Sequence, residues 1–176
     1  MARILGLDAA TKKTGYSILD DNYNVLECGV IRTTSSDVKE RLKEIYIEIE
    51  KKIIDNKIDY LVAEDVPVTK HNNLKTGKDL STLQGIILSL CFRYNVDYTF
   101  YNPSAWRSLV GTYDGTREGM KRQFQKQRAV DLINELYGLD FVYNETETKT
   151  RTTDDDKAEA ILIARAFLIE RSENKW

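Results

Sequence analysis

Two acidic residues each end a short apolar run, where their carboxylates could do chemistry together. Asp8 closes the run "ILGLD" and Glu64 closes "DYLVAE". If both runs are buried parallel strands that lie side by side, the two carboxylates meet at the edge where open α/β sheets place their ligands. Carboxylates a few ångströms apart raise each other's proton affinity unless a cation lies between them. A hard divalent metal such as Mg²⁺, which prefers oxygen ligands, would resolve that conflict.

A third group of acids lies in "TTDDDKAEA". Asp156 and Glu159 are three residues apart, so they share one face of a helix, and Asp154 and Asp155 come just before. Acids in the first turn after a threonine N-cap also favour the helix dipole without any metal, and this alternative stays open. Together with the two strand ends, the acids favour a two-metal site that could hydrolyse a phosphodiester.

The chain has too few histidines and cysteines for a catalytic or metal site that depends on them. The sequence has one histidine, His71, and two cysteines, Cys28 and Cys91, in no CxxC or Cys/His spacing. We therefore set aside a zinc site, a disulfide framework and Ser-His-Asp or Cys-His catalysis. Carboxylates, lysines and hydroxyls remain for the chemistry.

The net charge of the chain argues against a nucleic-acid partner, whereas the distribution of its basic residues allows one. The formal net charge is −2, whereas nucleic-acid-binding domains are commonly basic. Basic residues are concentrated in "PVTKHNNLKTGK", residues 67–78, and in "REGMKRQFQKQR", residues 117–128. Such segments can hold a phosphate backbone, but solvated surface charge is an equal alternative.

The apolar patterns predict strands and helices that alternate along most of the chain. We expect strands over 2–8, 14–19, 24–31, 59–64 and 96–103, and helices over 36–56, 78–94, about 118–137 and 154–171. This order predicts an α/β fold, with a mixed five-stranded sheet of three antiparallel strands followed by two parallel ones, flanked by helices. A right-handed crossover then places the strand that ends at Glu64 beside the strand that ends at Asp8.

Nothing in the 176 residues marks a linker or an internal repeat, so we expect one domain over residues 1–176. No apolar run approaches the roughly 18 residues of a membrane span, and the N-terminus has no secretion-signal layout. We therefore expect a cytoplasmic protein without a membrane partner.

Five segments, in this order and spacing, resemble the RuvC family of Holliday junction resolvases. They are "ILGLDAATKKTGYSIL", "YLVAEDVPV", "NLKTGKDLSTLQGIIL", "YNPSAWRSLVG" and "DDDKAEAILIA". The resemblance spans nearly the whole chain. It implies an RNase H-like fold and a homodimeric, Mg²⁺-dependent endonuclease that nicks two symmetric strands of a four-way DNA junction, with other branched DNA as further candidate substrates.

The resemblance also implies roles for particular residues. Asp8, Glu64, Asp156 and Glu159 would hold two Mg²⁺ ions, with Mn²⁺ as the alternative, and Lys126 would act catalytically near the scissile phosphate. The family usually has Asp at the position of Glu159, so Asp155 is the alternative ligand. The resemblance implies DNA contacts for Arg107 and Lys126, and the two basic segments add Lys121, Arg122, Lys75 and Lys78 as residues expected to bind DNA.

The helix over 78–94 resembles the family's dimerisation helix, and Gln84-Gly85 would let two such helices approach closely. Its broad apolar face is equally typical of a core helix. The chain has Pro67 where bacterial members have an aromatic residue, and "GTYDGTREGMKRQFQK" is longer than the bacterial segment. Both departures favour a phage-type resolvase, which would act in the host cytoplasm.

Two other function classes stay open. Actin-like phosphotransferases and ATPases also begin with an Asp-containing strand and hairpin, although they duplicate that unit in a second domain, for which there is no repeat here. A non-catalytic module that binds branched DNA would use the acids only as helix caps.

Overall fold

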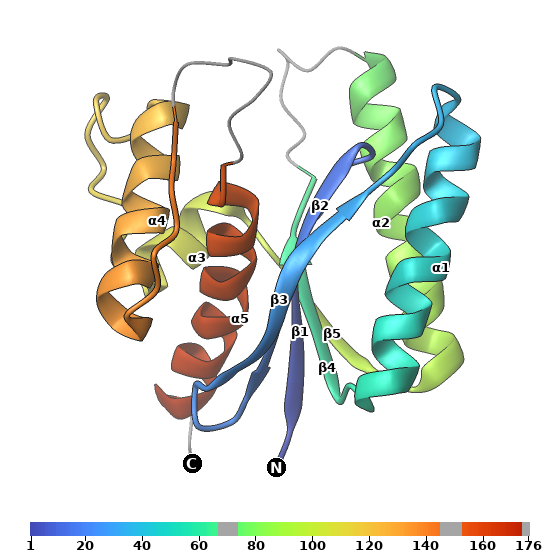
Figure 1. Cartoon of the computed structure of the whole chain (residues 1–176), viewed down its shortest axis with the longest axis horizontal. Coiled ribbons are helices and arrows are strands. Elements are labelled where there is room, and N and C mark those ends of the chain that lie inside the picture. Colours follow the sequence, from blue (N-terminus) through green and yellow to red (C-terminus); the bar gives the residue numbers. More distant parts are fainter. Residues whose placement is uncertain (67–73, 145–152, 174–176) are drawn as a thin grey trace.

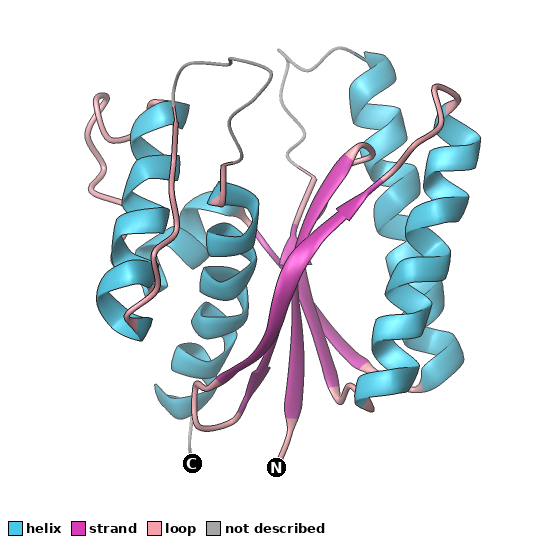
Figure 2. Ribbon diagram, in the orientation of Figure 1, coloured by secondary structure: helices cyan, strands magenta, loops and turns pink. Residues whose placement is uncertain are grey.

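A five-stranded mixed sheet forms the centre of the protein and has helices on both faces (Figures 1 and 2). The structure is a computed structural model and describes residues 1–66, 74–144 and 153–173. The strands are β1 (Arg3–Asp8), β2 (Lys13–Asp20), β3 (Val25–Arg32), β4 (Tyr60–Glu64) and β5 (Asp97–Tyr101), in the order β3-β2-β1-β4-β5. The predicted α/β class and strand order are confirmed.

The directions of the strands also agree with the sequence pattern. β2 runs antiparallel to both β1 and β3, whereas β1, β4 and β5 run parallel to one another. In the register of β1 and β4, Leu7 pairs with Ala63. The residues that follow this pair, Asp8 and Glu64, therefore leave the sheet at the same edge.

The helices divide between the two faces of the sheet (Figure 1). They are α1 (Val38–Asn56), α2 (Leu74–Tyr94), α3 (Pro103–Leu109), α4 (Arg122–Tyr137) and α5 (Asp155–Glu173). α1 and α2 cover one face, and their buried residues form a core with the sheet, as the spacing of Leu42, Ile45 and Ile49 in α1 requires. α3, α4 and α5 cover the other face and share a second core.

The first turn of α5 is buried although it carries the acids Asp155 and Asp156. It packs directly on β1 and β2 at two glycines, Gly6 and Gly15. A Cβ at Gly6 would overlap the backbone oxygen of Ala160, and a Cβ at Gly15 would overlap that of Asp156. Only glycine at these positions lets the helix lie close enough to bring its first turn to the end of β1.

Some predicted boundaries are wrong. β5 ends at Tyr101 rather than at 103, α2 begins at Leu74 rather than at 78, and α4 begins at Arg122 rather than at about 118. α3 was not predicted, since Pro103 was interpreted only as a strand stop. The sequence does carry its start signal: Asn102 caps the helix by accepting the N–H of Ser104, and proline suits the first turn.

Among residues 1–66, 74–144 and 153–173, none of the helices combines the length and the apolar content that a bilayer crossing needs.

Candidate active site

The acids predicted from the sequence come together in one cleft of about 1070 Å³. Asp8 and Glu64 reach it from the ends of β1 and β4. Asp155, Asp156 and Glu159 reach it from the first turns of α5. We call these five residues the acid cluster. The fold therefore gathers carboxylates that are up to 151 positions apart in the chain into a single site.

The three acids from α5 are buried, which is rare for carboxylates without partners. Asp155 is 4% exposed, Asp156 9% and Glu159 6%. Helix capping alone does not require burial, because an exposed first turn gives the same interaction with the helix dipole. Their burial therefore favours a site over a cap.

The acids raise each other's proton affinity, as expected for like charges in one site. Burial is the largest cause that holds the pKa of Asp8 well above its ordinary value, and the charges of Glu159 and Asp156 come next. Glu64 also raises this pKa, whereas the ammonium of Lys126 lowers it. A cation that entered the cluster would relieve this repulsion.

Lys126 of α4 faces the three acids of α5. Its Nζ forms an ion pair with Asp155 Oδ2 and lies 3.7 Å from Asp156 Oδ1 and 3.8 Å from Glu159 Oε2. Burial lowers the pKa of Lys126, but the charges of Glu159 and Asp155 outweigh it, so the pKa is raised overall. The side chain is only 12% exposed, which argues against ordinary surface charge.

α3 supplies two further contacts to the acid cluster. Arg107 Nη2 lies 3.0 Å from Glu159 Oε1 and 3.6 Å from Glu64 Oε2. Trp106 donates a hydrogen bond of 2.9 Å from Nε1 to the same Glu64 oxygen. Burial raises the pKa of Glu64, although Arg107 and Trp106 act in the opposite direction. Arg107, expected to bind DNA, is thus held inside the cleft by acids.

The donor set has the chemistry of a divalent metal site, but its side chains are paired with basic residues. Within the described residues, the His, Cys, Asp and Glu side chains form no group of three or more that is arranged to hold a metal ion. Yet all the donors are carboxylate oxygens, as Mg²⁺ prefers. Asp156 Oδ2 is buried without a hydrogen bond and meets Lys13 Nζ only as an ion pair. The residues therefore fit a hard divalent cation, provided that the basic side chains give way.

The remaining predicted DNA contacts lie at different distances from the acid cluster. Arg122 lines the same cleft. Lys121 is exposed and pairs with Glu118 at 2.6 Å. Lys75 and Lys78 are exposed on the first turns of α2 and are not among the residues that line the cleft. Pro67 lies outside the described residues.

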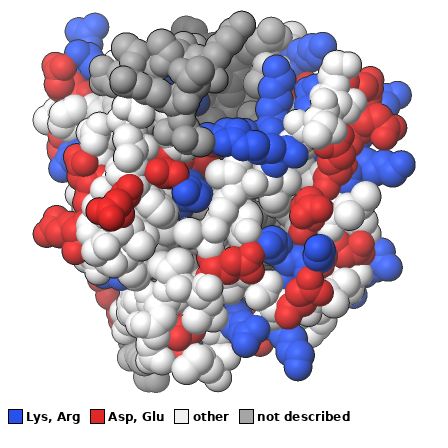
Figure 3. Space-filling view, in the orientation of Figure 1, with Lys and Arg blue, Asp and Glu red and all other residues white. Residues whose placement is uncertain are grey.

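The face in Figure 3 shows Lys and Arg side chains interspersed with Asp and Glu, without a broad surface of one sign. Binding of a phosphate backbone on this face would therefore depend on individually placed residues, in agreement with the net charge of −2.

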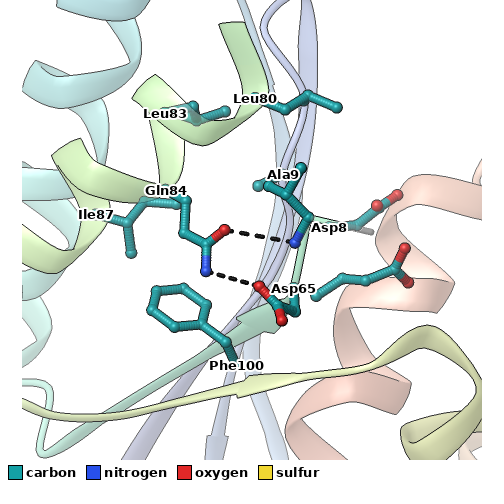
Figure 4. A pocket seen from close by; sticks show the side chains of 10 residues that line it. Asp8, Ala9, Asp65, Leu80, Leu83, Gln84, Ile87 and Phe100 are labelled. Atoms are coloured by element: carbon teal, nitrogen blue, oxygen red, sulfur yellow. Dashed lines mark hydrogen bonds between the residues drawn. The ribbon is translucent and has the colours of Figure 1, made fainter. Parts of the chain in front are cut away.

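The two residues after Glu64 form hydrogen bonds with α2, which packs on the opposite face of the sheet from α5 (Figure 4). Gln84 of α2 donates from Nε2 to Asp65 Oδ1 at 2.9 Å and accepts the backbone N–H of Val66 at 3.4 Å. These groups line a pocket of about 60 Å³ that also touches Asp8 and Glu64. The Asp8 carboxylate points away from Gln84 in this view (Figure 4).

Sequence reasoning missed Lys13, Trp106 and the role of Gln84. Lys13 follows Asp8 closely, as the first residue of β2 after the turn of the first hairpin, so its position was a usable signal. A buried tryptophan needs an acceptor for its N–H, but which acceptor it finds depends on how α3 packs.

A family model described as "Crossover junction endodeoxyribonuclease RuvC" matches residues 4–137. The crossover junction endodeoxyribonuclease RuvC of Fusobacterium nucleatum is 31% identical over 141 residues, which cover 78% of this chain and 69% of that protein. That of Orientia tsutsugamushi is 32% identical over 135 residues, covering 74% and 80%.

A solved structure, T. thermophilus RuvC in complex with Holliday junction substrate, has a TM-score of 0.74 at 14% identity and covers 99% of this chain and 97% of its own. This likeness concerns the fold and extends over α5. The family model, by contrast, ends at residue 137, so it includes Asp8, Glu64 and Lys126 but not the acids of α5. The assignment of those acids therefore rests on the geometry of this chain.

Proposed function

The chain belongs to the crossover junction endodeoxyribonuclease RuvC family, and from this premise we propose that it is a divalent-metal-dependent endonuclease that resolves four-way DNA junctions. Residues 1–176 would act as one RNase H-like nuclease domain. The observation that carries the proposal is the acid cluster, in which carboxylates from β1, β4 and α5 line one cleft.

Asp8, Glu64 and Asp156 would hold the metal, together with Glu159 or its neighbour Asp155. Two Mg²⁺ ions, or Mn²⁺ in their place, would activate a water molecule and stabilise the leaving oxygen of the phosphodiester when bound. Glu159 and Asp155 are both buried in the cleft and both contact Lys126, so the choice between them stays open.

The basic residues of the cleft would mainly neutralise the acids, and contact with DNA would be their second role. Lys13, Arg107 and Lys126 pair with the acid cluster and lower the cost of gathering its charges. Lys126 can also offer its ammonium to an oxygen of the scissile phosphate, as a point charge with three donors. Arg107 would mainly hold Glu159 and Glu64 in place, because its side chain is 12% exposed.

DNA outside the cleft would meet Arg122 at its wall and the exposed Lys121, Lys75 and Lys78 farther away. Such contacts to phosphates hold and orient a junction without reading its sequence. Other branched DNA would be accepted to the extent that its phosphates reach the same residues.

α2 would form the interface of a homodimer. Its inner face is buried in the core, whereas Leu74 is 92% exposed and Phe92 68% exposed. Gly85 lies on the same outer face as these two residues, since the spacings of 11 and 7 residues are close to whole helical turns. A Cβ added to Gly85 would meet nothing within 4 Å. This face has room for a second helix at close approach, which supports the proposed interface, while the opposite face of α2 belongs to the core.

The proposal is tested with purified protein on four-way, three-way and linear duplex DNA, with and without Mg²⁺. We expect nicking of the four-way junction only with Mg²⁺, and none with Asp8→Asn, which should bind the junction as well as the parent does or better, because a negative charge near phosphates is gone. Asp97→Asn changes an exposed acid at the opposite end of the sheet and should nick normally.

Nicking by Asp8→Asn at the rate of the parent would reject the acid cluster as the active site. Junction binding by the parent without nicking in Mg²⁺ or Mn²⁺ would leave the non-catalytic binding module as the better function.

A further inference from the structure

Trp106 lies inside the protein and uses its polar atom on a carboxylate of the acid cluster. The side chain is 1% exposed, and Nε1–H donates to Glu64 Oε2 at 2.9 Å. Indole nitrogen is a donor only, so a buried Trp106 that lost this acceptor would keep an unsatisfied N–H. Leaving a buried donor unpaired is costly. The contact therefore ties the Glu64 carboxylate to one position.

Arg107 strengthens the same restraint. Its guanidinium stacks over the Trp106 ring, with Cζ 4.3 Å from the ring centroid, and Nη2 lies 3.6 Å from Glu64 Oε2. Both donors thus reach one oxygen of Glu64. A carboxylate has a second oxygen with free lone pairs, so the restraint is compatible with binding a cation.

We propose that Trp106 is a positioning residue that fixes Glu64 through Oε2 and leaves Oε1 for a divalent metal. This inference rests on the proposed function, since it requires Glu64 to be a metal ligand. A free Glu side chain loses rotamer freedom when it binds an ion, and a donor that orders it beforehand removes that cost. Groups that hold a metal ligand in this way typically change metal affinity 10- to 100-fold.

Trp106→Phe keeps an aromatic ring in the core and removes the N–H. Mn²⁺ binding to the DNA-free protein, measured by electron paramagnetic resonance of the free ion, should weaken by about tenfold. The Mg²⁺ concentration for half-maximal nicking should rise by a similar factor, while KM for the junction should stay unchanged because the Trp106 side chain is buried, with 1% exposure.

Tyr101→Phe is the matched control. Tyr101 is 6% exposed, belongs to the same core as Trp106 and donates to the carboxylate of Glu170, which does not line the cleft. The variant loses a partly buried hydrogen bond to a carboxylate, as Trp106→Phe does, but should bind Mn²⁺ as the parent does. Unchanged Mn²⁺ binding by Trp106→Phe, or an equal loss in Tyr101→Phe, would overturn the proposal.

A second measurement leaves Trp106 intact, in case its replacement does not fold. With Trp176→Phe, Trp106 is the only tryptophan of the sequence, and Mg²⁺ should change its emission with the midpoint seen for nicking. Constant emission while nicking saturates would overturn the positioning role. Because Asp8→Asn tests the active site independently, loss of nicking in that variant with parent-like Mn²⁺ binding in Trp106→Phe would reject only the role of Trp106.

Discussion

The close approach of α5 to β2 at Gly15 gives a direct way to move the acid cluster. Gly15 pairs with Asp8 in the register of β1 and β2. A Cβ added to Gly15 would overlap the backbone oxygen of Asp156 and lie 3.0 Å from the Asp156 Cβ. Backbone atoms of a packed helix cannot step aside as the end of a flexible side chain can. Gly15→Ala must therefore push the first turn of α5 away from the sheet.

The expected size of the effect follows from that contact. Inserting one carbon into a well-packed interface typically costs about 1–3 kcal/mol of folding free energy. Relieving the overlap needs a shift of about 1 Å, and a misplacement of this size at a catalytic group can cost about 100-fold in rate. We expect Gly15→Ala to lose about 1–3 kcal/mol of stability and about 100-fold in nicking rate.

Urea denaturation in EDTA gives the stability, and Mg²⁺-dependent nicking of a four-way junction gives the rate. Gly77→Ala is the matched control: Gly77 lies in α2, and a Cβ there would meet nothing within 4 Å. Alanine is the better helix former by about 1 kcal/mol, so this variant should be at least as stable as the parent and nick normally. A Gly15→Ala protein with the stability and the nicking rate of the parent would refute the reasoning.

Three further predictions concern charge and assembly. Burial raises the pKa of Asp8, so the stability that its protonated form contributes is lost as the pH rises from the ordinary pKa of about 4 through the raised pKa. In EDTA, the melting temperature of Asp8→Asn minus that of the parent should therefore increase as the pH rises above about 4, and a constant difference would contradict this. Arg122→Gln should flatten the slope of log K for junction binding against log salt by about 0.9, measured by titration at several salt concentrations, whereas Lys43→Gln on α1 should not. Phe92→Asp should give a monomer in analytical ultracentrifugation while Leu26→Asp on β3 stays dimeric; a monomeric parent would refute the interface.

The sequence was sufficient for the sheet and for the strand ends that carry Asp8 and Glu64. Short apolar runs, a helix between them and the right-handed crossover rule leave few ways to arrange β1 and β4. α3 was missed because a proline after a strand was interpreted only as a stop. Asn102 before Pro103 is a helix start by local rules, and these rules operate without tertiary contacts.

The partners of the acids could not be predicted in the same way. Lys13, Arg107 and Trp106 reach the acid cluster from β2 and α3, and their contacts depend on how these elements pack on α5. Arg107 looked like a surface contact because arginine is usually exposed. Its partial burial follows from buried acids on a helix that the two glycines allow close to the sheet.

The central claim is that the acid cluster binds divalent metal ions. Anomalous diffraction from crystals grown with Mn²⁺ and a four-way junction tests it most directly. The account predicts Mn²⁺ density bounded by Asp8, Glu64 and Asp156, with Lys13 displaced from Asp156. Mn²⁺ bound elsewhere, with Lys13 and Lys126 still paired to the acids, would contradict it.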